Sequence, residues 1–203
     1  MIKRILLLCL ISSFGMLTAC SPALNFSKQE RALIHTGTEA NPFRVLTIVD
    51  PKDSQILRTP SRDLKKIKNN KDLSLLLKRM QVTMDKEEGI GIAAPQIGIN
   101  RNIFLFTRIH ETSKKVQVAI NPKIIAHAPE TVCFKRDGCL SIPDIRGNSR
   151  RYDWIEVRYY DENGILKQEK FSGHVRPENF TAVIFQHEFD HIQGVLFIDK
   201  LCE

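Results

Sequence analysis

The chain has 203 residues, of which 42% are hydrophobic and 26% charged, and this is enough for one globular domain with its own core. The formal net charge is +7 at pH 7, but acidic residues are interspersed among the basic ones along the sequence. This pattern indicates a solvated basic surface rather than a nucleic-acid-binding stripe, so we expect no nucleic-acid partner. The sequence has no internal repeat and no low-complexity tract, which argues against a repeat protein or a disordered one.

Residues 1–20 have the features of an export signal. Lys3 and Arg4 precede a mostly apolar run at residues 5–17, which is too short to cross a bilayer comfortably. The run ends in Leu-Thr-Ala-Cys at Cys20, which resembles the lipobox of bacterial lipoproteins. That resemblance implies cleavage before Cys20 and a lipid on its sulfur. The protein would then be anchored to a membrane, on the outer side of the inner membrane or in the periplasm.

Two alternatives to the lipoprotein signal are an uncleaved membrane anchor and a mis-assigned start, for instance at Met16. If the signal is not functional, the protein is cytoplasmic. Residues 21–41 are polar and lack clear periodicity, so we expect them to form a tether. The folded domain is then expected to span residues 42–203.

The first part of this domain is predicted to contain a strand and a helix. Residues 43–49 predict a short strand that ends at Asp50-Pro51. An apolar stripe with helical spacing follows a turn-rich, basic stretch at residues 57–70. The stripe consists of Leu73, Leu76, Leu77, Met80 and Met84. We expect Asp72 to cap this helix and Gly89 to end it.

Most of the remaining elements are predicted to be strands. Apolar runs or alternating patterns predict strands at residues 103–107, 116–120, 123–128, 154–160, 165–171 and 195–198. Asn121-Pro122 is expected to break the chain between two of them. The Asp-Glu-Asn-Gly sequence at residues 161–164 predicts a hairpin turn.

A glycine-rich segment, GIGIAAPQIG, occupies residues 89–98. Small residues at this density let a backbone approach a neighbour closely. A phosphate-binding loop is a poor match, because no Lys-Ser/Thr pair follows and the segment comes after a helix rather than a strand. The alternative is a tight turn beside a packed helix. Its one polar side chain, Gln96, can hydrogen-bond a substrate carbonyl.

Two histidines four residues apart, His187 and His191, give the strongest chemical signal in the sequence. On a helix this spacing puts both imidazoles on one face, where they can share a metal ion. Glu188 lies beside them, placed to take a proton from a metal-bound water. We expect the helix to begin at Asn179 as its N-cap and to stop at Gly194. The alternative is a buried helix whose histidines bond backbone carbonyls, but the full pattern favours a metal.

The cysteines offer a third metal ligand. Cys9, Cys20, Cys133, Cys139 and Cys202 contain no Cys-x-x-Cys pair, and their number and spacing do not predict a disulfide framework. A catalytic metal site needs three protein ligands and an open position for water. Cys139 is a candidate, because a thiolate with two imidazoles is an established catalytic set. The alternative is an inert, small core residue.

Three motifs in order, GIGIAAPQ at residues 89–96, DGCLS at 137–141 and QHEFDH at 186–191, together resemble the peptide deformylases. These are metal-dependent hydrolases that remove the formyl group from N-formyl-methionine at the start of bacterial proteins. The resemblance covers about residues 43–200. It implies an α+β fold, with antiparallel or mixed β-sheets packed around a central metal-binding helix.

The resemblance also implies the roles of the central residues. Cys139, His187 and His191 match the family's metal ligands, and Glu188 matches its general acid/base. The side chain of Gln96 and the backbone N–H of Leu140 match the groups that stabilise the oxyanion.

Further residues match the substrate-binding parts of the family or are expected near them. Gly91 matches a backbone contact to the substrate. Arg146 and Arg151 follow the cysteine motif where the family often has arginines, and we expect them to orient substrate or to brace the site. Asp190 is expected to support the helix or a neighbouring arginine. An apolar pocket for the methionine side chain is expected to be lined by Ile90, Ile142, Phe180 and Ile184.

The implied cofactor is one divalent metal ion, Fe(II) first, with Zn or Ni able to occupy the same ligands. The implied partners are N-formyl-methionyl peptides, which release formate. One alternative is a metal-dependent peptidase, which would usually take its third ligand downstream of His191. Another is an envelope lipoprotein that binds formyl peptides without turnover.

The sequence departs from the family's pattern in three ways. Asp137 stands where the family usually has Glu, and its shorter arm is expected to loosen a bond to the ligands. The sequence stops at Glu203 without the C-terminal helix of many members. An exported enzyme would meet substrates other than nascent chains, such as released formyl peptides. Cys133 is close enough in sequence to pair with Cys139 if the metal is lost.

Overall fold

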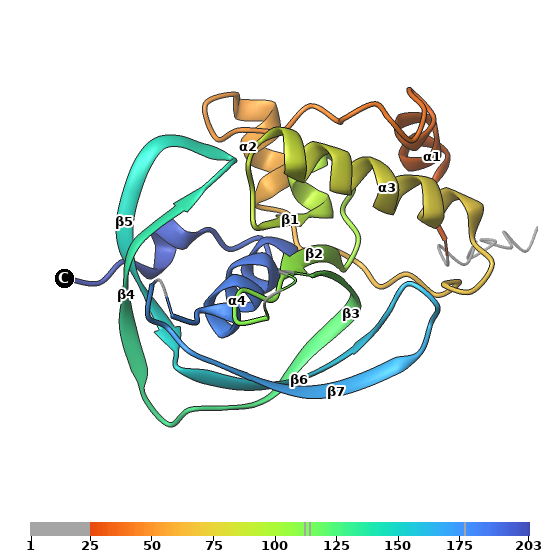
Figure 1. Ribbon diagram of the computed structural model, residues 1–203. Helices are drawn as coiled ribbons and strands as arrows, with labels where there is room; N and C mark the ends of the chain where they lie inside the picture. Colours follow the sequence, from red (N-terminus) through yellow and green to blue (C-terminus); the bar gives the residue numbers. More distant parts are fainter. Residues whose placement is uncertain (1–24, 112, 114, 177) are drawn as a thin grey trace, which may run out of the picture.

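The computed structural model describes residues 25–111, 113, 115–176 and 178–203 (Figure 1). Its helices are α1 (Lys28–Ile34), α2 (Pro51–Leu57), α3 (Lys71–Lys86) and α4 (Thr181–Ile192), with short 3-10 helices η1 (Ala94–Ile97) and η2 (Phe197–Lys200). Its strands are β1 (Gly91–Ala93), β2 (Ile103–Thr107), β3 (Val116–His127), β4 (Thr131–Cys139), β5 (Ile142–Tyr152), β6 (Trp154–Tyr160) and β7 (Leu166–Ser172). In the described part of the chain, no helix is both long and apolar enough to span a membrane.

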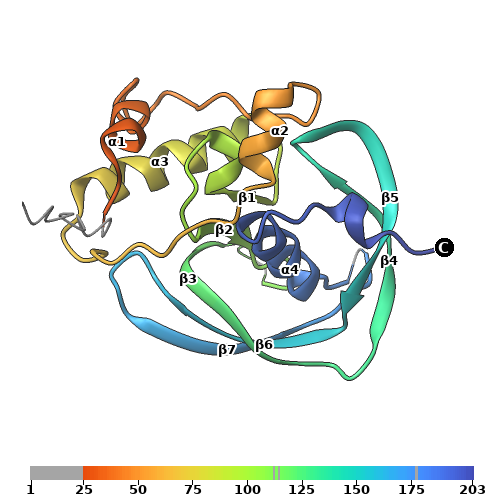
Figure 2. The same ribbon diagram turned by 180° about the vertical axis from the view of Figure 1, so that it is seen from behind.

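The strands form two antiparallel sheets around a central helix. One sheet has the order β1-β2-β3-β6-β7, and the other is the β4-β5 hairpin. Helix α4 lies between them, while α1, α2 and α3 lie on the other side of β1 and β2 (Figures 1 and 2). This is the α+β arrangement around a central helix that the sequence predicts.

Two buried apolar clusters pack the helices against the five-stranded sheet, one around α4 and one around α3. Phe185 of α4 packs edge-on against Phe104 and Phe106 of β2, with ring centroids 4.9 and 5.2 Å apart. On the opposite side, Leu73 and Met80 of α3 belong to a second buried cluster. All five residues of β2 are buried because both faces of this strand are covered. The apolar stripe predicted at residues 73–84 is therefore a packing face of α3, and Phe185 anchors α4 against β2 in the centre of the molecule.

Helix α4 begins and ends close to the positions expected. Its N-cap is Phe180, one residue later than predicted, but the Asn179 side chain accepts a hydrogen bond from the Thr181 N–H at 3.0 Å. Gly194 has φ +73°, the left-handed conformation that commonly follows a helix and that glycine adopts without strain.

Several expected boundaries are wrong. Residues 43–49 form no strand. The chain enters α2 directly after them, where Asp50 caps the helix through the N–H groups of Lys52 and Asp53, with Pro51 at the first helical position. Helix α3 is capped by Asn70 and not by Asp72, which lies in its first turn, and it ends at Lys86 before Gly89. Residues 195–198 end in the 3-10 helix η2 and form no strand.

The expected tether at residues 21–41 is also wrong over its described part. Ser27 and Glu30 form a capping box at the start of α1, and Phe26 and Ile34 are buried. This segment packs against α3 because its few apolar residues reach the core. The expected signal and lipid site at residues 1–20 lie outside the described residues.

The break expected at Asn121-Pro122 is a distortion within one strand. Strand β3 runs continuously from Val116 to His127 with a register shift, and Asn121 has φ +50°. Strands β6 and β7 and the turn between them lie close to the predicted positions. The β4-β5 hairpin, which carries Cys139 at the end of β4, was not predicted.

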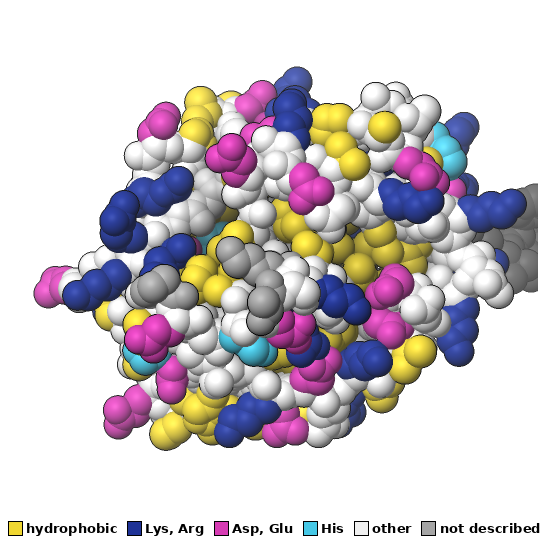
Figure 3. All heavy atoms as spheres, in the orientation of Figure 1, with side chains coloured by type: hydrophobic (Ala, Val, Ile, Leu, Met, Phe, Trp, Pro, Cys, Tyr) yellow, Lys and Arg dark blue, Asp and Glu magenta, His cyan; other side chains and the backbone are white. Residues whose placement is uncertain are grey.

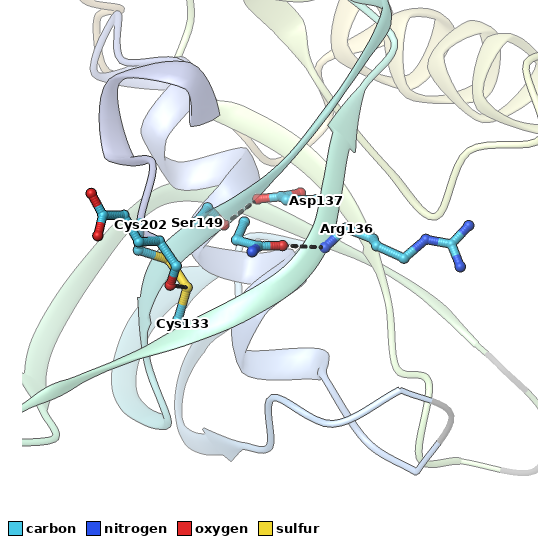
Figure 4. The surroundings of a disulfide bond; sticks show 7 residues. Cys133, Arg136, Asp137, Ser149 and Cys202 are labelled. Atoms are coloured by element: carbon cyan, nitrogen blue, oxygen red, sulfur yellow. Dashed lines mark hydrogen bonds between the residues drawn. A yellow bond between two sulfur atoms is a disulfide. The ribbon is translucent and has the colours of Figure 1, made fainter.

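One disulfide joins Cys133 on β4 to Cys202 (Figure 4). The two cysteines are 69 residues apart, and they meet because the C-terminal segment lies against β5, where the Cys202 N–H bonds the Asn148 carbonyl at 2.9 Å. The number and spacing of the cysteines did not predict this pair. Because Cys133 is bonded to Cys202, it is not the partner of Cys139, which is a free, buried thiol.

Candidate metal centre and active site

Helix α4 and the end of β4 bring three metal-ligating side chains together. His187 and His191 lie one turn apart on α4, with ring centroids 5.1 Å apart. The Cys139 Sγ lies 3.1 Å from His191 Nε2. One ligand atom from each of Cys139, His187 and His191 lies within 4.8 Å of the others. The structure therefore assembles the sulfur and two nitrogens that the sequence predicts.

A buried carboxylate orients one of these histidines. Asp137 Oδ1 lies 3.3 Å from His187 Nδ1, which leaves His187 Nε2 to face the sulfur side. Burial raises the pKa of the Asp137 carboxyl, but the charges of His187 and Arg151 and the Ser149 hydroxyl outweigh this and hold the pKa well below its usual range. Asp137 is therefore an anion, and a carboxylate behind a histidine ligand fixes the orientation of the ring.

A chain of ion pairs braces this carboxylate. Arg151 is 1% exposed and donates to Asp137 Oδ2 at 3.0 Å and to Asp190 Oδ2 at 2.5 Å. Ser149 Oγ donates to the same Asp137 oxygen at 2.6 Å (Figure 4), and Lys200 donates to Asp190 at 2.6 Å. Arg151 is thus a brace and does not reach the cavity, and Asp190 supports an arginine as expected. The shorter arm of Asp137 still reaches its partners.

Glu188 lies beside the three ligands with an unused oxygen. Its Oε2 is buried and has no hydrogen-bond partner among the described residues. In the protein alone, burial raises the pKa of the Glu188 carboxyl to about 7, although the charge of His187 opposes this. A carboxyl group that changes protonation near neutral pH is suited to general acid/base chemistry.

Gly91 of β1 lies directly against this carboxylate. A Cβ added at Gly91 would collide with Glu188 Oε1 and would lie 2.8 Å from its Cδ. Only a residue without a side chain lets β1 approach α4 this closely. The glycine-rich segment is therefore the wall that faces Glu188, and its backbone approaches a neighbour closely, as the sequence predicts.

Gln96 is held rigidly with its amide toward the sulfur. Its Oε1 accepts the Ala93 N–H at 2.8 Å, and its Nε2 donates to Ser141 Oγ at 3.2 Å and lies 3.6 Å from Cys139 Sγ. Leu140 follows the sulfur ligand directly and lines the same cavity as Gln96. Both oxyanion-stabilising candidates thus lie at the site.

An open cavity of about 650 Å³ leads to this cluster. Its walls include Cys139, His187 and Glu188 together with Gly91, Ile90 and Arg146. Three of the four predicted apolar residues line it: Ile90, Phe180 and Ile184. Ile142 does not, because it is fully buried against Leu196 and Phe197 on the far side of Cys139.

Several lining residues were not predicted. Phe134 and Val183 add to the apolar wall, and Arg136, Arg176, Glu87 and Glu88 add charges. Val183 is one turn before His187, so the helical spacing could have placed it. Glu87 and Glu88 follow Met84 at helical spacing, at the end of the helix that the sequence predicts. Phe134 and Arg136 come from the unpredicted hairpin and Arg176 from an irregular segment, which gave no periodic signal.

The residues present fit a metal ion. The donor set of one thiolate and two imidazoles suits Fe(II), Zn or Ni, and it leaves a coordination position open. The unsatisfied Glu188 Oε2 and the carboxylate behind His187 are what a catalytic metal site requires around its ligands.

An α+β fold with this Cys-His-His cluster and an adjacent buried glutamate defines a metal-dependent hydrolase. The sequence model of the polypeptide deformylase family matches residues 44–203. The chain therefore belongs to the polypeptide deformylase family.

Relatives in sequence support this assignment. The chain is 39% identical over 135 residues to the peptide deformylase of Karelsulcia muelleri, across 66% of this chain and 68% of that protein. It is 34% identical over 159 residues to the peptide deformylase of Thermotoga neapolitana, across 78% of this chain and 87% of that protein.

Solved structures show the same fold. The crystal structure of peptide deformylase from Thermotoga maritima matches with a TM-score of 0.69 and 32% identity, over 80% of this chain and 99% of that chain. The Met-Ala-Ser-bound class I type b peptide deformylase from Acinetobacter baumannii matches with a TM-score of 0.70 and 28% identity, over 80% of this chain and 99% of that chain.

Proposed function

We propose that the chain removes the formyl group from N-formyl-methionyl peptides and releases formate, using one divalent metal held by Cys139, His187 and His191. The observation that carries this proposal is the convergence of these three ligand atoms within 4.8 Å, next to a buried glutamate. Membership of the family supports the reaction, and the cluster supports the use of a metal ion to carry it out. A relative with Met-Ala-Ser bound supports a peptide of this kind as the substrate.

The metal would supply a Lewis acid and a water that ionises near neutral pH. Glu188 takes a proton from the attacking water at its free Oε2 and returns it to the leaving nitrogen. The Leu140 N–H and the Gln96 N–H that now points toward Cys139 Sγ would donate to the oxygen that becomes negative, while the Ala93 N–H holds the Gln96 carbonyl in place. The buried position of Glu188 keeps bulk water from competing for that proton.

The substrate is proposed to lie against β1 and the apolar wall. Gly91 offers its backbone beside Glu188, and Ile90 lies next to it at the cavity. The methionine side chain would pack against Phe180, Ile184 and Val183, which lie on the helix that carries the histidines or at its start. Arg146 is proposed to contact the peptide beyond the methionine.

The metal is proposed to be Fe(II), as the family commonly uses, with Zn and Ni as alternatives. Protein reconstituted anaerobically with Fe(II) is expected to release formate from formyl-Met-Ala-Ser, with metal content measured on the same sample. Binding of the peptide without formate release, with one metal bound, would contradict the enzyme and favour a formyl-peptide-binding protein.

Lipid anchoring through Cys20 is a separate proposal. Its support is the order of basic residues, apolar run, small residue and cysteine at residues 3–20. The Cys133–Cys202 disulfide also fits an oxidising compartment outside the cytosol. The wild-type protein is expected in the membrane fraction and the Cys20→Ala variant outside it. A Cys20→Ala protein that stayed in the membrane would contradict lipid attachment at this residue.

A further inference from the structure

Three arginines share one side of the cavity mouth: Arg136 on β4, Arg146 on β5, and Arg176 in the segment between β7 and α4. Figure 3 shows several Lys and Arg side chains on the side of the molecule formed by β4 and β5. Elsewhere, Arg108 and Arg151 are paired with carboxylates. Among the described residues, none of the three arginines at the mouth has such a partner. Each is positioned by a different local structure.

Arg176 is held over an aromatic shelf. Its guanidinium carbon lies 4.8 Å from the centre of the Phe134 ring and 4.4 Å from that of Phe180, and the two rings are stacked 5.6 Å apart. Such cation–π contacts fix a guanidinium while leaving its N–H edge free to donate. Burial and the like charges of Arg136 and Arg146 lower the pKa of Arg176, although Asp137 opposes this. Arg176 therefore lies close enough to Arg136 and Arg146, which line the same cavity, for their charges to repel it.

Arg136 takes an uncommon backbone conformation. Its φ is +57°, and it lies in the register shift between Phe134 and Asp137. The side chain of Asn148 accepts the Arg136 N–H at 3.2 Å (Figure 4). Bulges of this kind redirect a side chain. In Figure 4 the Arg136 side chain extends away from the disulfide on the other side of the strand.

Arg146 lies across Gly138, the residue before the sulfur ligand. A Cβ at Gly138 would come within 2.6 Å of both Cδ and Cζ of Arg146. Arg146 can therefore pack over the backbone beside Cys139 only because Gly138 has no side chain. From Cys139 back to Arg136 is three residues of strand, or about 10 Å. An extended peptide that runs along β4 from Cys139 would therefore pass these arginines within its first three or so residues.

The chemistry of the substrate explains what these arginines can bind. A formylated N-terminus carries no charge, so a short formyl peptide with neutral side chains has one charge, its C-terminal carboxylate. A chain still attached to the ribosome has no such carboxylate within about 10 Å of its formyl group. Building on the proposed function, we propose that Arg136, Arg146 and Arg176 form a carboxylate subsite that selects short, released formyl peptides.

The opposite side of the mouth carries the opposite charge. Glu87 and Glu88 line it between α3 and β1. A carboxylate is repelled from that wall and drawn to the arginines, so the two walls together orient a peptide in one direction. An acidic side chain at the third position would use the same subsite, and the experiment separates these two sources of the carboxylate.

The experiment compares four peptides on the metal-loaded enzyme: formyl-Met-Ala-Ser as free acid and as amide, and the amides of formyl-Met-Ala-Asp and formyl-Met-Ala-Lys. The free acid is expected to have a KM about tenfold below that of its amide, with similar kcat. The ratio should fall as salt is raised. Preference for the Asp amide over the Lys amide would assign side-chain carboxylates to the subsite as well; equality of those two amides would restrict it to the C-terminus.

The variants Arg136→Gln and Arg176→Gln are each expected to reduce the acid-to-amide ratio severalfold. The matched control is Arg150→Gln, which removes an exposed arginine of β5 that does not line the cavity, and it should leave the ratio unchanged. Equal KM values for acid and amide in the wild-type protein, or an equal effect of all three variants, would overturn the proposal.

Binding of the same peptides to the Glu188→Gln variant is measured as dissociation constants, so that this part of the test does not depend on turnover. If the metal-loaded wild-type enzyme released no formate, the proposed function would fail. A tenfold preference of Glu188→Gln for the acid would still support the subsite, and equal binding would reject it.

Discussion

At the scale of single residues, the contact between Gly91 and Glu188 allows the position of the Glu188 carboxylate to be tested. In Gly91→Ala the new methyl group must displace the Glu188 carboxylate, because it would lie 2.8 Å from Cδ. A displacement of this size near reacting groups reduces rate by about a hundredfold, so we expect kcat/KM for formate release to fall by about that factor. Metal content should stay near one per chain, since Glu188 is not a ligand.

The control for this change is Gly89→Ala in the same segment. Its added methyl group would meet two flexible side chains, at Leu140 Cδ1 and Met84 Cγ, both at 3.3 Å, and the Gly91 carbonyl oxygen at an ordinary 3.4 Å. Those side chains need to shift by only a few tenths of an ångström, so the loss of activity should be much smaller. Equal activity of Gly91→Ala and the wild-type protein would contradict the position assigned to Glu188.

Asp137 provides a second test at the residue scale, because its charge orients His187 and pairs with Arg151. Asp137→Asn is expected to weaken metal binding by about 10- to 100-fold, as is usual when the partner behind a histidine ligand is lost. Competition with a chelator measures this directly. The exposed Asp144, which has φ +63°, supplies the control Asp144→Asn, because asparagine also tolerates that conformation. Unchanged affinity in Asp137→Asn would show that this carboxylate does not support the ligands.

At the scale of the element, α1 is joined to the domain by a buried ion pair. Glu30 accepts two hydrogen bonds from Arg101, at 2.8 and 2.7 Å, and Arg101 is fully buried. Burial raises the pKa of Glu30, but the hydrogen bonds from Arg101 and Ser27 and the Arg101 charge outweigh it, so the pKa lies below its usual value. The folded state therefore gains stability from ionised Glu30 above the pKa of the unfolded chain. This gain is lost as pH falls through the lower pKa of the folded state.

Glu30→Gln weakens the charge-assisted hydrogen bonds from Arg101, so it is expected to lower the free energy of unfolding by about 2 kcal/mol at pH 7. The difference from the wild-type protein should shrink below about pH 4. Denaturant unfolding at a series of pH values measures this. The control is Glu39→Gln, which removes an exposed pair with Lys78 and should cost less than about 1 kcal/mol. If the difference in free energy of unfolding between the wild-type protein and Glu30→Gln grew as the pH fell, the stabilising role of ionised Glu30 would be contradicted.

The elements that the sequence predicted well carry a local signal. The helix with His187 and His191 has apolar spacing, an Asn179 side chain that accepts the Thr181 N–H just before the helix, and a Gly194 stop, and all of these act within the segment itself. The β4-β5 hairpin escaped prediction because its apolar alternation is interrupted where β4 shifts register near Asp137 and Cys139. The register shift lies next to the metal ligand Cys139, and it breaks the alternating pattern by which a strand is recognised in a sequence.

The same reasoning explains which site residues could be found. Cys139 and Glu188 lie within short motifs whose chemistry is readable from residue type and spacing. Arg136 and Arg176 are separated by 40 positions in the sequence and meet only through the fold. Cys133 and Cys202 likewise give no local sign that they pair, because contact between distant segments is decided by tertiary packing.

At the scale of the whole molecule, the Cys133–Cys202 disulfide closes a loop that contains β5, β6, β7 and α4. A cross-link over 69 residues is worth about 4 kcal/mol through the entropy of the unfolded chain. The double variant Cys133→Ser/Cys202→Ser is expected to lose up to this amount in denaturant unfolding, and a reducing agent should leave it unaffected. Alkylation of Cys133 and Cys202 in the oxidised, unfolded wild-type protein would contradict the cross-link.

The central claim is that one sulfur and two histidine nitrogens from separate parts of the chain hold a single metal ion. X-ray absorption at the metal edge of the zinc-substituted protein measures these ligands directly. We expect one sulfur at about 2.3 Å and two nitrogens at about 2.0 to 2.1 Å. The sulfur shell should be absent in Cys139→Ser, while Cys133 and Cys202 remain paired. A wild-type spectrum with only nitrogen and oxygen neighbours would contradict the account.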